Sequence, residues 1–109
     1  MTMDESKYLQ LAHAAFEKIQ DALEDVDSSD VDVDSAGDVV TLTMKGGVKC
    51  IVNTQRPTKQ IWLAARARAW HFNYDESKKQ WLDDKGTGAE LFETVAKILK
   101  EGADVDVSF

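Results

Sequence analysis

The middle of the chain alternates short strand-like runs with links too short to carry it across a sheet. The links are polar or contain glycine or proline, and the runs are residues 31–34, 39–44, 48–53, 60–65, 70–74 and 80–82. A parallel crossover needs roughly a dozen residues or more, so consecutive strands joined by these links must be antiparallel neighbours. We therefore expect an antiparallel sheet of five or six strands over residues 31–82.

An amphipathic helix is expected on each side of these strands. Residues 4–26 repeat apolar side chains at three- and four-residue steps, which places them on one helix face, with Ser6 as the expected N-cap. Thr87 and Glu90 have the spacing of a capping box, which predicts a second helix over residues 89–101. Gly102 is the expected stop of that helix.

Two helices with apolar faces and one sheet favour a two-layer arrangement. We expect an α+β fold, a two-layer α-β sandwich in which the N- and C-terminal helices pack on one face of the antiparallel sheet. The other face is then open to water. Strand parity places Ile61 and Leu63 towards the core and Trp62 on the open face, beside Gln60 and Asn53. An exposed tryptophan among amides is a plausible partner patch.

Charge is unevenly distributed along the chain. The segment from Glu17 to Asp38 holds nine carboxylates and one base, a formal charge of −8 against −7 for the whole chain. From Val39 to Tyr74 there is no acidic residue but there are six basic ones. The protein is therefore expected to have an acidic end and a basic end.

Composition excludes several classes of protein. At 109 residues the chain is expected to be one domain, residues 1–109. No apolar run reaches the roughly 18 residues of a membrane span, and the N-terminus lacks a secretory signal pattern. The single cysteine, Cys50, excludes an internal disulfide and is expected to be a small buried hydrophobe, which fits a cytoplasmic location. A pI of about 4.7 argues against nucleic acid as a partner.

No catalytic set is present in the sequence. The two histidines, His13 and His71, have no nucleophile or phosphate loop at a suitable spacing, so we expect a protein that is not an enzyme. An EF-hand is excluded because Asp30 stands where the loop glycine is required. The carboxylates suit hard cations such as Mg²⁺, Ca²⁺, Mn²⁺ and iron. From the residues alone, a surface for cations or basic proteins and a merely solvated charge remain open alternatives.

One motif resembles a known family. Residues 53–64 read NTQRPTKQIWLA, and Trp70-His71-Phe72 follows. This stretch resembles the central motif of the frataxin family at Asn53, Gln55, Pro57, Gln60, Trp62, Leu63 and Ala64. The acidic first helix and Asp-alternating strand are also similar to the family. A departure occurs at residues 65–69, ARARA, where relatives usually carry glycine between two strands.

The resemblance implies weak binding of iron, Fe²⁺ or Fe³⁺, at an acidic ridge that is also open to other divalent cations. By position, that ridge is Glu17, Asp21, Glu24, Asp25, Asp27, Asp30, Asp32 and Asp34. It also implies a regulatory or iron-supplying role in iron-sulfur cluster assembly, through a cysteine desulfurase and its scaffold protein.

The partner-binding residues that the resemblance implies are Asn53, Gln55, Gln60 and Trp62. We expect no nucleic-acid or membrane partner, and a monomer that can oligomerise with iron. The alternative is a non-enzymatic acidic adaptor that binds basic proteins and meets metals only incidentally. A ferroxidase would need a two-iron site of bridging carboxylates or histidines, and the sequence has no such spacing.

Overall fold

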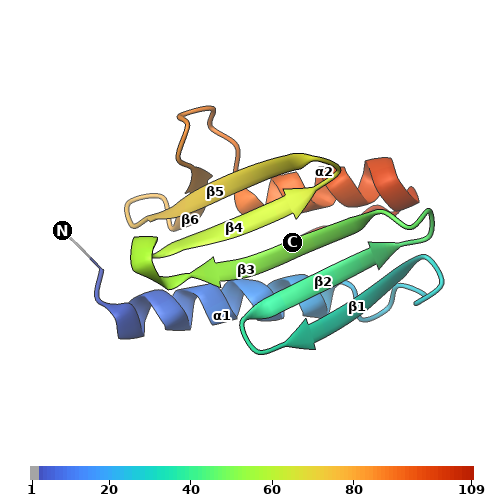
Figure 1. Cartoon of the computed structure of the whole chain (residues 1–109), viewed down its shortest axis with the longest axis horizontal. Helices are drawn as coiled ribbons and strands as arrows, with labels where there is room; N and C mark the ends of the chain where they lie inside the picture. The colour runs from blue at the N-terminus through green and yellow to red at the C-terminus, as the bar shows by residue number, and fades with distance from the viewer. Residues whose placement is uncertain (1–2) are drawn as a thin grey trace.

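The computed structural model describes residues 3–109 and shows two helices and a six-stranded sheet (Figure 1). The elements are α1 (Glu5–Ala22), β1 (Val31–Ala36), β2 (Val39–Met44), β3 (Lys49–Gln55), the 3₁₀ turn η1 (Arg56–Thr58), β4 (Gln60–Ala65), β5 (Arg68–Asp75), β6 (Gln80–Asp83) and α2 (Leu91–Ala103). The expected α+β class is confirmed.

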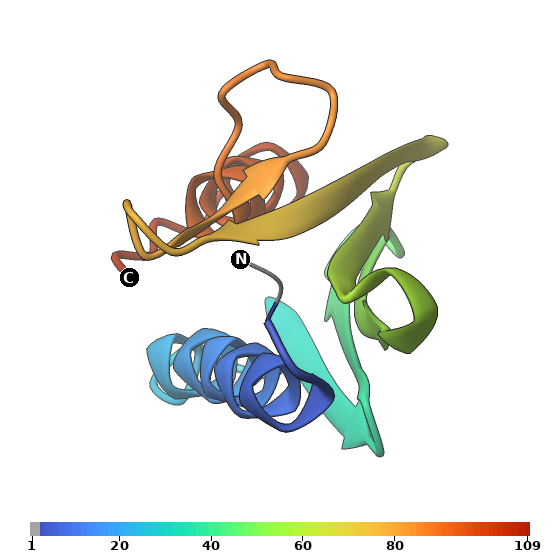
Figure 2. The same ribbon diagram turned by 90° about the vertical axis from the view of Figure 1, so that its left-hand side faces the viewer.

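The sheet follows the order of the chain. Its strands lie in the order β1 to β6, and each pairs antiparallel with the next. Both helices lie on the same side of the sheet, with α1 beside β1 and α2 beside β5 and β6 (Figure 2). Leu42, Val52, Leu63 and Phe72 point from neighbouring strands into the core beneath the helices, each at most 1% exposed. The opposite face has no covering element within residues 3–109.

The helix ends differ from the sequence predictions. α1 begins after Asp4, whose carboxylate accepts a hydrogen bond from the Lys7 amide at 2.7 Å, so Ser6 is not the N-cap. It ends at Ala22, four residues earlier than predicted, because the chain continues in turns towards β1. α2 begins after Glu90, which itself caps the amides of Phe92 and Glu93.

Gly102 is not a helix stop. It lies inside α2, and Asp104 instead takes the left-handed cap position at φ 55°. A Cβ atom at residue 102 would collide with the sulfur of Met44 on β2. The glycine therefore permits close packing of α2 against the sheet, and Asp104 is held by an ion pair with Lys100 at 3.0 Å.

Tyr8 fastens α1 to the sheet. Its ring is fully buried, and its hydroxyl donates to the Gln60 carbonyl at 2.6 Å and accepts from the Gln55 amide at 3.1 Å. Burial raises the pKa of this phenol, because the ionised form would lose its hydration. One side chain thereby positions the start of β4 and the end of β3, which carry the predicted partner patch.

Tyr8→Phe is expected to lower the free energy of unfolding by about 1–3 kcal/mol, because the Gln60 carbonyl and the partly buried Gln55 amide both lose their partner. Chemical denaturation measures this change. The control is Tyr74→Phe, whose hydroxyl has no hydrogen bond within residues 3–109. Equal losses in the two variants would show that the hydroxyl of Tyr8 does not fasten the helix.

The remaining core predictions hold. Cys50 is fully buried, and burial raises the pKa of its thiol to about 12, so it acts as a small hydrophobe. Val105, Val107 and Phe109 in the C-terminal tail are partly buried against the core, as their alternation predicted. Within residues 3–109 no helix is long and apolar enough to cross a membrane.

Candidate functional site

The first half of the acidic ridge lies on α1 and the turns that follow it. We use the name acidic ridge for Glu17, Asp21, Glu24, Asp25, Asp27, Asp30, Asp32 and Asp34. The first four are exposed, while Phe16 and Ile19 on the same helix are buried. The helical spacing thus sorts the apolar side chains to the core and the carboxylates to one solvent-facing flank.

The second half of the ridge lies on the turn before β1 and on β1 itself. Asp27 uses its carboxylate locally: it accepts from the Ser29 hydroxyl and amide, which lowers its pKa. Asp30 lies 3.9 Å from the Lys45 ammonium, a loose surface pair. Asp32 and Asp34 alternate with core-facing Val31 and Val33, so both project onto the open sheet face.

The ridge does not form a closed metal cage. Among residues 3–109 no group of three or more His, Cys, Asp or Glu side chains is arranged to hold a metal ion. Exposed carboxylates without such a cage bind hard cations weakly and with little selectivity.

The predicted partner patch comes together on the open face. The antiparallel register sets Asn53 opposite Trp62, and Gln55 opposite Gln60. On the other side of Trp62 the register places His71, whose ring stacks on the indole with centroids 4.3 Å apart. Trp62 is half-buried while Ile61 and Leu63 are not exposed, which confirms the parity prediction.

A hydrogen-bond network holds Trp62 in place. Its indole N–H donates to the Gln60 side-chain oxygen at 2.9 Å, and the Gln60 amide nitrogen donates to Asn73 at 3.2 Å and Asp84 at 3.1 Å. Gln60 is only 8% exposed, so its amide is fixed by these three contacts. Trp62 is thereby preorganised for contact with a partner.

Three residues of this network were absent from the predicted patch: His71, Asn73 and Asp84. In the sequence, Trp70, Phe72 and Tyr74 alternate with His71 and Asn73, so that His71 and Asn73 share one face of their strand. This alternation did not show which strand lies next to Trp62. Asp84 lies in a turn after β6, and its contact with Gln60 arises only from tertiary folding.

The β1 part of the ridge, Asp32 and Asp34, shares the open face of the sheet with the patch, whereas Glu17 and Asp21 lie on α1 on the other side of the sheet. Across β1 to β4 the register runs from Asp34 through Thr41 and Ile51 to Ala64, next to Trp62 along β4. Ile51 and Val39 on this face are large hydrophobic residues more than a third exposed. Carboxylates at the β1 edge thus flank an apolar and amide surface, the composition of a protein-binding face with a charged rim.

The carboxylate of Asp38, the last in the acidic segment, already pairs with two side chains of this chain. It accepts from Arg56 at 2.9 Å and pairs with His13 at 2.9 Å, and these partners lower its pKa. Asp38 therefore links α1, the β1–β2 turn and η1.

Crowding of charge on the ridge predicts a salt-dependent stability. The melting temperature should rise between about 10 mM and about 300 mM salt, because screening shortens the range of repulsion between exposed carboxylates. A divalent cation should raise it further at equal ionic strength, since binding to the folded state adds stability by mass action. Thermal unfolding followed by circular dichroism measures both effects, and a flat salt series would contradict the crowding.

A comparison with protein families decides the classification. Residues 1–105 match the model of the frataxin-like domain. The chain belongs to the frataxin family. The family membership that residues 53–64 predicted is therefore confirmed, and the match extends over nearly the whole chain.

This frataxin-family chain is similar in sequence to named bacterial proteins. It is 33% identical over 109 residues to a Pseudomonas fluorescens protein named iron-sulfur cluster assembly protein CyaY, covering 100% of this chain and 97% of the relative. A protein of the same name from Variovorax paradoxus is 38% identical over 98 residues, covering 87% and 86% of the two chains.

Solved frataxin structures share the fold. Frataxin from Psychromonas ingrahamii superposes with a TM-score of 0.88 at 30% identity, covering 97% of each chain. Trimeric frataxin from Saccharomyces cerevisiae, complexed with ferrous iron, superposes at 0.73 with 21% identity, covering 96% of this chain and 90% of the yeast chain. The latter likeness is one of fold.

Proposed function

We propose that this protein acts in iron-sulfur cluster assembly, carrying loosely bound iron on the acidic ridge and docking through the open sheet face. Its partners would be a cysteine desulfurase and the scaffold protein on which clusters form. It would regulate the desulfurase or supply iron without catalysing a reaction itself. The names of the bacterial relatives support the pathway, and the ferrous complex of yeast frataxin supports the cargo.

The observation that carries the proposal is the shared face. Asp32 and Asp34 project from the same side of the sheet as Asn53 and Trp62, and the antiparallel register joins them through adjacent strands. A partner seated on the Trp62 patch would lie beside the ridge. Iron on the ridge would then lie close to the partner protein. That partner would either receive the iron or present a basic surface that competes with iron for the same carboxylates.

Weak binding suits a carrier of iron. Ferrous and ferric ions are hard enough to prefer carboxylate oxygens. Since no cage of three ligands is preformed within residues 3–109, each ion would keep much of its hydration and exchange readily. Mg²⁺, Ca²⁺ and Mn²⁺ would compete for the same carboxylates.

The second candidate, an acidic adaptor, is favoured by the same absence of a preformed ligand group. In that case the ridge carboxylates would serve to attract a basic protein surface, and cations would only screen them. The two candidates predict different NMR titrations with ferrous iron. An iron carrier should show signal changes confined to the ridge residues, and an acidic adaptor should not.

The proposed function is tested in a reconstituted cluster-assembly reaction containing desulfurase, scaffold, cysteine and iron. Adding the purified protein should change the rate of cluster formation, and the change should depend on iron concentration. The control is the variant Lys97→Gln, at an exposed position of α2 on the other side of the sheet from the patch. A rate that is unaffected by the protein at any iron concentration would contradict the proposal.

A further inference from the structure

Trp62 belongs to a closed cycle of contacts among four side chains on the open face. Its indole donates to Gln60, and the Gln60 amide donates to Oδ2 of Asp84 at 3.1 Å. The same Asp84 oxygen lies 3.6 Å from Nδ1 of His71, and the His71 ring stacks on the indole at an interplanar angle of 18°. Asp84 therefore reaches Trp62 by two routes, one through an amide and one through an imidazole.

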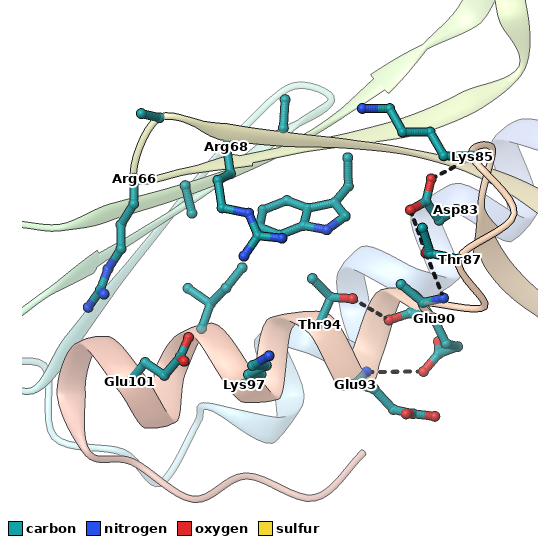
Figure 3. A pocket seen from close by; sticks show the side chains of 16 residues that line it. Arg66, Arg68, Asp83, Lys85, Thr87, Glu90, Glu93, Thr94, Lys97 and Glu101 are labelled. Atoms are coloured by element: carbon teal, nitrogen blue, oxygen red, sulfur yellow. Dashed lines mark hydrogen bonds between the residues drawn. The ribbon is translucent and has the colours of Figure 1, made fainter.

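The loop that carries Asp84 is fixed by its backbone. The Asp84 amide donates to the His71 carbonyl at 2.8 Å, which ties the loop to β5. The preceding residue, Asp83, accepts from the Lys85 amide and the Thr87 hydroxyl, each at 2.8 Å, as Figure 3 shows beside the pocket next to α2. These contacts place the Asp84 carboxylate beside β4 and β5.

The two routes respond differently to protons. The Gln60 amide does not titrate, so its route is the same at every pH near neutrality. A distance of 3.6 Å is too long for a hydrogen bond, so a neutral His71 ring gains little from Asp84. A protonated ring is attracted to this carboxylate, and it also places a cation over the Trp62 ring, whose centroid is 4.3 Å away. Histidine changes charge between about pH 5 and about pH 8.

The charged groups that face His71 come from one side. β4 places the uncharged Trp62 beside it, and β6 with its loop places Asp83 and Asp84 there. The hydrogen bond from the Lys85 amide lowers the pKa of Asp83, so this carboxyl stays ionised near neutral pH. Both neighbouring carboxylates therefore attract a proton to His71.

We propose that Asp84 is a positioning residue of the docking face, which holds Trp62 more firmly when His71 is protonated. The inference rests on the proposed function, because the docking partner is the scaffold protein. A partner that requires one orientation of the indole binds better when that orientation is already fixed. Proton binding and scaffold binding then favour each other by the same factor.

The test measures scaffold affinity at about pH 6 and about pH 8 and takes the ratio of the two. This ratio should be about threefold larger in the parent than in Asp84→Asn, the size of effect expected for an exposed ion pair with a cation–π contact. Asparagine keeps a carbonyl oxygen for Gln60 but loses the charge that attracts His71. His71→Gln, which removes the titrating ring, should lower the ratio as far. Titration of the scaffold itself is common to all variants and cancels.

Two controls separate this cycle from other effects of pH and charge. His13→Gln removes the other histidine of the chain, which lies on α1 and pairs with Asp38, and should keep the ratio of the parent. Asp106→Asn removes one charge from the C-terminal tail and should also keep it. A merely structural Asp84 would weaken binding in Asp84→Asn equally at both pH values, and such an unchanged ratio would overturn the proposal.

A second readout needs no partner. In NMR spectra of the free protein, the indole N–H signal of Trp62 should move together with the ring signals of His71 as the pH is lowered. The movement should be smaller in Asp84→Asn, and equal movement in this variant and the parent would overturn the proposal. If the parent bound no scaffold at either pH, the proposed function would be contradicted, and this titration would still decide the role of Asp84.

Discussion

Replacing Asp30, Asp32 and Asp34 together by asparagine should slow association with a basic desulfurase roughly tenfold at low salt. The substitutions keep the side-chain shape but change the net charge from −7 to −4, because three carboxylates become amides. Rim charges steer encounter more than they hold a complex, so the association rate should change more than the dissociation rate. Stopped-flow or surface-based kinetics over a salt series measures this.

The same variant should fold at least as stably as the parent. Asp32 and Asp34 are exposed and have no ion-pair partner within residues 3–109, and Asp30 has only the loose contact with Lys45. Neutralising these three carboxylates removes their mutual repulsion, and losing one loose surface ion pair changes the free energy of unfolding little. The matched control is Asp104→Asn with Asp106→Asn and Asp4→Asn, an equal charge change away from the ridge. Equal slowing by both triple variants would show that net charge alone, and not the ridge, controls association.

Trp62→Ala should weaken scaffold binding by roughly thirtyfold or more, because a preorganised tryptophan at the centre of a face is a typical hot spot. The fold should lose less than the about 3–5 kcal/mol expected for a buried tryptophan. Trp62 is only half-buried, and it stacks on the His71 ring and donates one hydrogen bond to Gln60. Binding titrations and chemical denaturation on the same variant give both numbers.

His71→Ala is the companion variant. It removes the stacking partner but leaves the Gln60 contact that orients the indole, so its effect on binding should be smaller than that of Trp62→Ala. A loss of stability by Trp62→Ala as large as a core truncation would contradict the position of Trp62 on the open face.

The fold was predictable because its determinants are local. Short links impose antiparallel neighbours, and the alternation of Ile61, Trp62 and Leu63 fixes which face each side chain takes. The helix ends were less predictable because several residues compete for the cap. Asp4 and Glu90 accept the backbone hydrogen bonds in place of Ser6 and Thr87. Gly102 was misread since its role depends on Met44, a contact made only in the folded chain.

The part of the candidate site that comes from one continuous segment could be predicted from the sequence. The part built from residues of several distant segments could not. The ridge carboxylates lie on α1, the following turns and β1, consecutive in sequence, so charge counting finds them. The contact of Asp84 with Gln60 and the pairing of Trp62 with His71 depend on strand order and loop path. Whether the ridge carboxylates ligate iron stays a prediction, as does the partner role of Asn53, Gln55, Gln60 and Trp62.

The most direct test is a crossed titration of ferrous iron and scaffold protein against the parent, the triple asparagine variant and Trp62→Ala. We predict that the triple variant loses iron affinity and the selective perturbation of ridge signals in NMR spectra, while it retains most of its scaffold affinity. Trp62→Ala should bind iron like the parent and lose the scaffold. If the triple variant binds iron as the parent does, the metal site lies outside β1 and its preceding turn, and the acidic adaptor becomes the better description.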